Sequence, residues 1–80
     1  MNLVMYVRTA CPLCDRLELM MDPYLKRTGH QLTKHDIDEQ QQFHDLYTDR
    51  VPVLTHGQQV ILEGRPKAAQ VEEAMARLER

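Results

Sequence analysis

Apolar residues occur along the chain in short continuous runs and at helical spacing, which predicts an α/β fold. Residues 2–7 ("NLVMYV") are apolar apart from Asn2, and we expect a central strand buried on both faces. Residues 31–38 ("QLTKHDID") predict a more polar strand that ends on an acidic helix cap. Residues 51–62 ("VPVLTHGQQVIL") contain two apolar runs around a glycine-containing turn, which predicts a β-hairpin.

A long helix is predicted from Pro12, because proline fits the first helical position, where its missing N–H has no cost. One stripe of this helix is apolar and contains Leu13, Leu17, Met20, Met21 and Tyr24. Pro23 removes a backbone donor inside the helix, so we expect a break or kink near Asp22. Gly29 should end this unit.

Two further helices complete the predicted order β-α-β-α-β-β-α. A short amphipathic helix is predicted around Phe43, Leu46 and Tyr47. A terminal helix is predicted after Gly64 and Pro66, from the spacing of Ala68, Val71, Met75 and Leu78. A right-handed crossover should make the first two strands parallel, and the hairpin should add antiparallel strands on the other side of the first strand. The result is a four-stranded mixed sheet with three helices.

Length and composition limit the classes of function. Eighty residues suit one domain over residues 1–80, and 42% hydrophobic with 28% charged residues is typical of a globular protein. The net charge of −2 has no basic block, which argues against a nucleic-acid partner. Residues 2–7 are too short for a signal-peptide core or a membrane span, so we expect a cytoplasmic protein without a membrane partner. We also expect a monomer.

The only two cysteines, Cys11 and Cys14, lie one helical turn apart after the first strand. A bridge between them would close too small a loop to restrain the unfolded chain strongly, and the cytoplasm keeps ordinary thiols reduced. A structural disulfide is therefore disfavoured. A redox pair, half of a metal site or two incidental thiols remain.

Position on the helix gives the two thiols different chemistry. Cys11 lies at the helix N-terminus, where free N–H groups and the helix dipole favour the thiolate, so it is the candidate nucleophile. Cys14 lies one turn further in and is the candidate resolving thiol, which can displace a mixed disulfide from Cys11. Pro12 fixes the backbone between them, whereas the charge of Asp15 opposes the thiolate.

Two alternatives belong to other classes of function. The residues Cys11, Cys14, His30 and His35 have the spacing C-x2-C-x15-H-x4-H, which is close to that of a zinc finger. Both cysteines lie on a predicted helix, however, which argues against a structural zinc module. The other alternative is a redox-inert adaptor that keeps the fold for partner binding.

The chain resembles the glutaredoxin-like branch of the thioredoxin superfamily over nearly its whole length. The matching features are "CPLC" after the first strand, Arg8 three residues before Cys11, "DID" after the second strand, "VP" before the third, and Gly64 before the last helix. The resemblance implies a thioredoxin-like, glutaredoxin-type fold and a thiol–disulfide oxidoreductase. Glutaredoxins usually have Pro-Tyr between the cysteines, and Leu13 makes the chain more similar to small bacterial glutaredoxin-like proteins.

The resemblance also implies where substrates bind. A cis bond before Pro52 would place this proline opposite Cys11 and leave the backbone polar groups of Val51 free for a disulfide substrate. Arg8 is either a contact for the glycine carboxylate of glutathione or a solvated strand end, and Asp36 and Asp38 are interpreted as capping and loop residues. The implied substrate contacts are Arg8, Pro12, Leu13, Val51, Pro52, Gly64 and Arg65.

Residues 62–67 ("LEGRPK") differ from the glutathione-binding stretch of typical glutaredoxins, which has two glycines, a small residue and an aspartate. Glu63 replaces the first glycine and Pro66 replaces the aspartate, so an N–H donor and a carboxylate are missing. Arg65 and Lys67 supply some positive charge instead. We expect weak glutathione dependence, no tightly bound cofactor or metal, and protein or small-molecule disulfides as substrates, with glutathione a candidate reductant.

Overall fold

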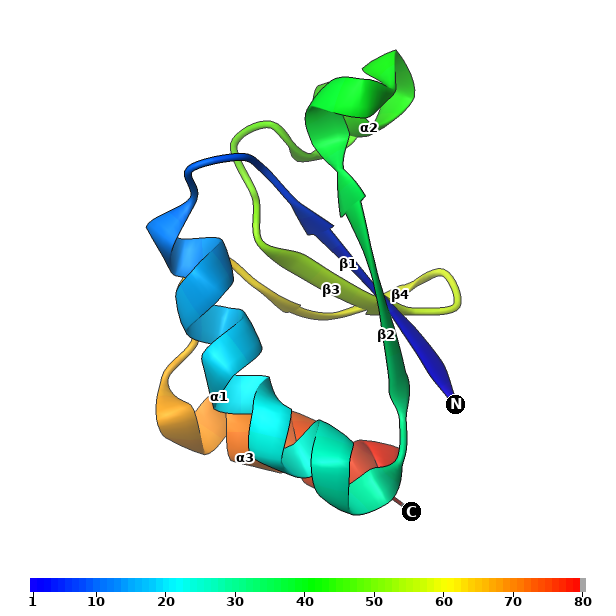
Figure 1. Ribbon diagram of the computed structural model, residues 1–80, viewed down its shortest axis with the longest axis vertical. Helices are drawn as coiled ribbons and strands as arrows, with labels where there is room; N and C mark the ends of the chain where they lie inside the picture. The colour runs from blue at the N-terminus through cyan, green and yellow to red at the C-terminus, as the bar shows by residue number, and fades with distance from the viewer. Residues whose placement is uncertain (80) are drawn as a thin grey trace.

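A four-stranded sheet forms the centre of the computed structural model, which describes residues 1–79 (Figure 1). The strands are β1 (Asn2–Val7), β2 (Gln31–Asp36), β3 (Val53–His56) and β4 (Gln59–Glu63). They lie in the order β2-β1-β3-β4, with β1 and β2 parallel and with β3 antiparallel to both β1 and β4. The predicted order of elements and the mixed sheet are confirmed.

Two long helices cover one face of the sheet, and a short helix lies at one end of it (Figure 1). The helices are α1 (Pro12–Thr28), the 3-10 turn η1 (Ile37–Glu39), α2 (Gln41–Tyr47) and α3 (Ala68–Leu78). Side chains of α1 and α3 meet those of the sheet in one core cluster, whose fully or almost fully buried members include Leu3, Met5, Leu17, Met21, Leu54, Val71 and Met75.

The first strand is buried on one face rather than on both. Leu3 and Met5 have no exposed surface and point into the core, whereas Val4 and Tyr6 on the other face are only half-buried. The prediction of two-sided burial was wrong because α1 and α3 both pack on the same face of the sheet. The run of apolar residues did not show that one face of β1 is only partly buried.

Of the break or kink expected near Asp22, the structure has no break, because helix α1 continues through Pro23 to Thr28. Pro23 deprives the Leu19 carbonyl of its helical donor, but Pro23 is exposed and Leu19 is 74% exposed, so water can satisfy that carbonyl. Figure 1 shows the helix axis changing direction in this part of α1, as expected for an internal proline. Gly29 then ends the helix in the left-handed conformation, with φ 76°.

An aromatic cluster partly covers the other face of the sheet. The Tyr6 ring lies 4.4 Å from the Tyr47 ring and 5.0 Å from the Phe43 ring, measured between centroids. The His35 ring lies 5.8 Å from that of Tyr6. Burial, with a smaller contribution from Tyr47, raises the pKa of Tyr6. These contacts hold α2 against the sheet, whereas Leu46, predicted to share the apolar side of α2, is exposed.

Two leucines on α1 give a matched test of the core. Leu17→Ala should lower the free energy of unfolding by about 2 to 5 kcal/mol, because Leu17 is fully buried and its truncation leaves a cavity. Leu19→Ala removes the same atoms from an exposed position and should change the free energy by less than about 0.5 kcal/mol. Urea denaturation of both variants measures the difference, and equal losses would contradict the packing described for α1.

Candidate functional site

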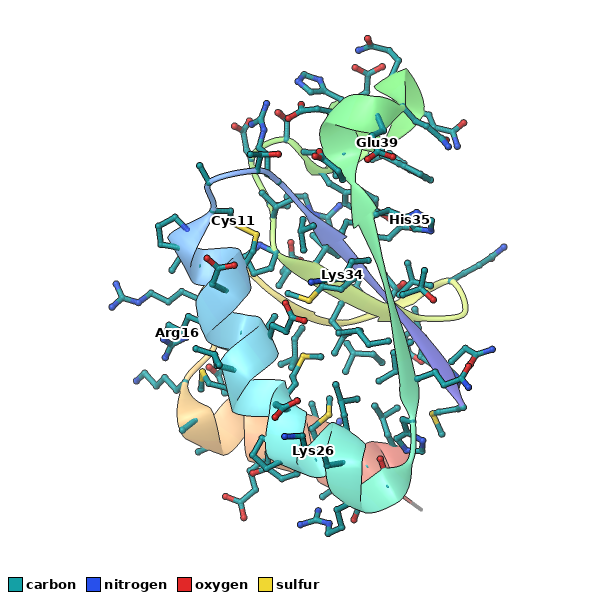
Figure 2. All side chains as sticks on the ribbon, viewed as in Figure 1. Cys11, Arg16, Lys26, Lys34, His35 and Glu39 are labelled. Carbon is teal, nitrogen blue, oxygen red and sulfur yellow. A yellow bond between two sulfur atoms is a disulfide. The ribbon has the colours of Figure 1, made fainter. Side chains whose placement is uncertain are left out.

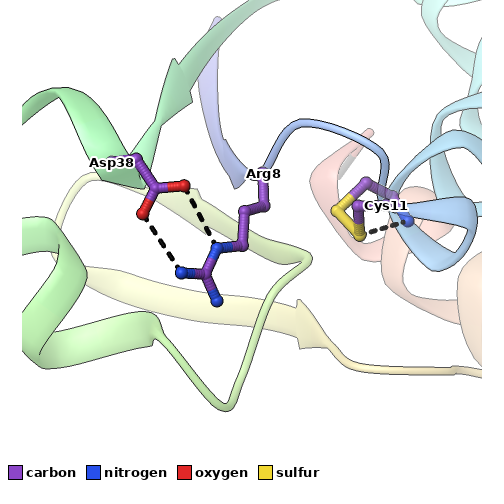
Figure 3. Close-up of a disulfide and its surroundings, with 4 residues drawn as sticks. Arg8, Cys11 and Asp38 are labelled. Carbon is purple, nitrogen blue, oxygen red and sulfur yellow. Dashed lines mark hydrogen bonds and ion pairs between the residues drawn. A yellow bond between two sulfur atoms is a disulfide. The ribbon is translucent and has the colours of Figure 1, made fainter.

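The two cysteines lie where the loop after β1 enters α1, and they form a disulfide (Figure 3). The loop turns at Ala10, which has a positive φ of 54°, an uncommon conformation for a residue with a side chain. Cys11 is the N-cap of α1 and has an extended backbone. The Cα atoms of Cys11 and Cys14 are 5.2 Å apart, within the range of ordinary disulfides.

The two sulfur-bearing residues differ in burial and in hydrogen bonding. Cys11 is half-buried, whereas Cys14 is only 4% exposed and belongs to the core cluster with Leu17. The Cys14 N–H lies 3.2 Å from Cys11 Sγ and donates to it. A donor at this position would also stabilise negative charge on that sulfur after reduction. The geometry therefore makes Cys11 the accessible member of the pair and Cys14 the internal one.

Pro52 lies in the segment that leads into β3, after a cis peptide bond with Val51. Pro52 is buried, and its carbonyl accepts a hydrogen bond of 2.8 Å from the Gly64 N–H. The Val51 N–H donates to the Tyr47 carbonyl at 3.1 Å. The prediction that the polar groups of Val51 are free was therefore wrong for its N–H, because the end of α2 already supplies an acceptor.

Arg8 is turned away from the disulfide and toward Asp38 (Figure 3). Its Nε and Nη2 atoms donate to the two Asp38 carboxylate oxygens, each at 3.2 Å, and Nη1 donates to Thr48 Oγ1 at 3.3 Å. The hydrogen bond and charge of Asp38 raise the pKa of Arg8. Asp36 accepts a hydrogen bond from the Asp38 N–H at 2.9 Å, as expected for a capping residue. The charge of Arg8 is thus already matched by a carboxylate of the same chain.

Residues 63–67 run beside the start of α1 and connect β4 to α3. Glu63 accepts hydrogen bonds of 2.8 and 3.3 Å from Arg50, which lowers the pKa of Glu63. Gly64 has a φ of 71°, a conformation that favours glycine. Arg16 Nη1 donates to the carbonyl of the buried Pro66 at 2.8 Å. Sequence reasoning did not select Arg16, because its partner lies fifty residues away in the chain.

Pro12 and Leu13 lie on the surface between the two cysteines. Leu13 is 37% exposed, although its spacing predicted a place in the buried stripe of α1. Cys14 begins that stripe instead, with Leu17 and Met21 following at helical spacing. A hollow of about 450 Å³ lies elsewhere, between β4 and α3, and neither cysteine lines it. The candidate site is thus a surface around Cys11 rather than an enclosed cavity.

The two histidines of the zinc alternative do not meet the cysteine pair. His30 lies directly before β2 and interacts with the N-terminal amine of Met1, at the start of the parallel pair β1 and β2. The cysteines follow the other end of β1, and His35 belongs to the aromatic cluster. Within residues 1–79, no group of three or more His, Cys, Asp or Glu side chains is arranged to hold a metal ion. No helix in that range is long and apolar enough to cross a membrane.

The model of the Glutaredoxin-like domain (DUF836) matches residues 2–76, which include the cysteine pair, the cis-proline segment and most of α3. The chain belongs to this glutaredoxin-like family. No curated protein matches the chain significantly.

Solved structures are similar to this chain in fold. Target protein XcR50 from X. campestris is 27% identical, with a TM-score of 0.74 over 96% of this chain and 95% of its own. The thioredoxin Deadhead from Drosophila melanogaster is 17% identical, with a TM-score of 0.65 over 96% and 79% of the two chains. A thioredoxin mutant from Halobacterium salinarum is 23% identical, with a TM-score of 0.63 over 95% and 72%. The two thioredoxins share the fold.

The unequal burial of the cysteines predicts unequal labelling of the reduced glutaredoxin-like protein. Iodoacetamide should modify Cys11 at least about tenfold faster than Cys14, because Cys11 is accessible and has an N–H donor at its sulfur. Mass spectrometry of Cys11→Ser and Cys14→Ser, labelled separately across a range of pH, measures the two rates. Faster labelling of Cys14 would reverse the assignment of their roles.

Proposed function

We propose that this glutaredoxin-like protein is a small thiol–disulfide oxidoreductase with Cys11 as nucleophile and Cys14 as resolving thiol. One observation carries the proposal: a bonded cysteine pair begins α1, with one member accessible and the other in the core. A pair placed for stability alone would have no need of an accessible sulfur. The match to the glutaredoxin-like family supports this reading.

The proposed reaction has two exchange steps. The reduced Cys11 thiolate attacks one sulfur of a substrate disulfide, forms a mixed disulfide and releases the other sulfur as a thiolate, which takes a proton from solvent. The Cys14 thiolate then attacks Cys11 Sγ, releases the second substrate thiol and closes the Cys11–Cys14 bond. Two electrons pass from the protein to the substrate. An external thiol, such as glutathione or a dithiol protein, must return them before the next turnover.

The surface around Cys11 has contacts for a disulfide substrate. Pro12 and Leu13 are exposed between the cysteines and offer an apolar area. Val51 is half-buried and packs against the same core cluster as Cys11. In this proposal the carbonyl of Val51 is available to a substrate backbone, while its N–H stays bonded to Tyr47. A protein or small-molecule disulfide can approach because no cavity wall encloses the site.

We further propose that glutathione binds weakly and that no cofactor is held tightly. Three features support this. Arg8 is bidentate to Asp38, so a glutathione carboxylate must displace an internal one. Pro66 offers neither an N–H nor a carboxylate, and Glu63 adds a negative charge that is shared with Arg50. The cycle suits a reducing compartment, such as the cytoplasm, and a monomer is sufficient for it.

The two-step reaction is tested by removing the resolving thiol. Cys14→Ser should accumulate a mixed disulfide between Cys11 and a peptide disulfide, since the second step is blocked. Intact-mass spectrometry detects the adduct, and Cys11→Ser is the control that should form none. A wild-type protein that neither closes the pair in glutathione redox buffers nor reduces any disulfide would instead be a redox-inert adaptor.

Weak glutathione selectivity is tested with two substitutions in the Cys14→Ser background. Pro66→Asp restores a carboxylate and an N–H, and Asp38→Asn leaves Arg8 without its internal anion. Each should raise the rate of deglutathionylation relative to exchange with a neutral peptide disulfide. The gain should be roughly ten- to a hundredfold, which corresponds to about 1 to 3 kcal/mol. Asp45→Asn is the control, because Asp45 lies on α2 and accepts from Gln41 rather than from Arg8. Strong glutathione preference in the Cys14→Ser protein, with no gain in either variant, would contradict the proposal.

A further inference from the structure

Most basic side chains of the protein are paired with carboxylates. The sequence has ten lysines and arginines, nine of them in residues 1–79, and six of these nine form ion pairs with Asp or Glu. The three without an acidic partner in that range are Arg16, Arg65 and Lys67. Unpaired charges can be scattered over a surface, but these three are not.

Arg16, Arg65 and Lys67 lie around Pro66, just before the start of α3, and we call them the basic cluster. Arg16 Nη1 donates to the Pro66 carbonyl, and the exposed Arg65 and Lys67 flank Pro66 in the chain. Figure 2 shows Arg16 on the side of α1 that faces the connection to α3, below Cys11. An arginine has five N–H donors, so the single bond to Pro66 fixes the side chain and leaves other donors for a ligand.

The basic cluster lies next to the cysteine pair. Arg16 comes five residues after Cys11, which is about 7.5 Å along the helix axis. On the other segment, the Gly64 N–H is bonded to the Pro52 carbonyl at 2.8 Å, so the residues before α3 stay beside the cis proline. The side of α1 that carries Arg16 and the segment before α3 can therefore be reached by residues that neighbour a substrate disulfide at Cys11.

The surface of α1 changes sign around its axis. Asp15, Glu18 and Asp22 line a shallow hollow together with Leu19, whereas Arg16 lies about 100° around the helix from Asp15. Glu18 and Asp22 are paired with Lys34 and Lys26, so Asp15 is the acidic residue most available to oppose a ligand. An acidic substrate is attracted on one side of Cys11 and repelled on the other, which orients it.

We propose that the basic cluster docks an acidic segment next to the disulfide of a protein substrate. This inference rests on the proposed function and adds a substrate class to it. Arg65 and Lys67 are exposed and long, and no cavity encloses them, so they suit an extended polypeptide better than a small anion in a fixed pocket. The net charge of −2 would by itself disfavour acidic partners, so a preference for them must come from this local group.

The test compares three peptide disulfides that differ only in the residues beside the cysteine: glutamates, lysines or glutamines. Wild type should have a kcat/KM at least roughly tenfold higher for the glutamate peptide than for the lysine peptide at low ionic strength. The ratio should fall to about twofold at roughly 1 M salt, because the screening length between exposed charges is then only about 3 Å. Because the ratio compares two substrates of the same protein, a change that affects kcat/KM for both peptides equally does not alter it.

Two double variants, each of which removes two positive charges, distinguish an effect of the basic cluster from an effect of the protein's net charge. Arg65→Gln with Lys67→Gln should lower the ratio to about twofold. Lys26→Gln with Arg77→Gln removes two charges near the far ends of α1 and α3 and should leave the ratio as in wild type. An equal fall in both, or a wild-type ratio near one, would overturn the inference. If no peptide is reduced, the proposed oxidoreductase function fails; if the glutamine peptide is reduced and the ratio is one, only the docking surface fails.

Discussion

The packing of α1 on the sheet determines where both sulfurs lie. Cys14, Leu17 and Met21 follow one another at helical spacing and are buried against Leu3 and Met5 of β1. Cys14 is therefore the first member of the core stripe, and Cys11 lies one turn earlier, where the helix reaches solvent. The burial of this apolar stripe alone explains why Cys14 is buried and Cys11 is accessible.

Ion pairs decide which charges around the site are available. Arg8 and Arg50 lie on segments that approach the cysteines and Pro52, and both are matched by carboxylates of the same chain, Asp38 and Glu63. Arg16 is bound to a carbonyl, which does not neutralise it. The positive charge near the site that has no acidic partner consequently lies around the start of α3 rather than in the loop after β1.

Local patterns in the sequence were sufficient for most of the fold and for the cysteine pair. The helical spacing, the strand-like runs and the residues at helix ends predicted the order of elements, because each depends on neighbours within a few positions. The pairing of Arg8 with Asp38 and of Arg16 with Pro66 joins residues thirty and fifty positions apart. The bond from the Val51 N–H to the Tyr47 carbonyl depends on how α2 ends. The one-sided burial of β1 depends on which face of the sheet α1 and α3 pack against. These features arise from three-dimensional packing, and no short pattern encodes them.

The proline inside α1 also affects how the helix opens. Pro23 has no N–H, so the row of backbone hydrogen bonds lacks one member at the exposed Leu19 carbonyl. Fraying that begins at the C-terminal end of a helix spreads by breaking consecutive bonds, and a missing bond interrupts their cooperativity. The last turns of α1 are therefore joined to the first turns by one backbone hydrogen bond fewer, while Leu17 and Cys14 anchor the first turns in the core and hold the two sulfurs in place.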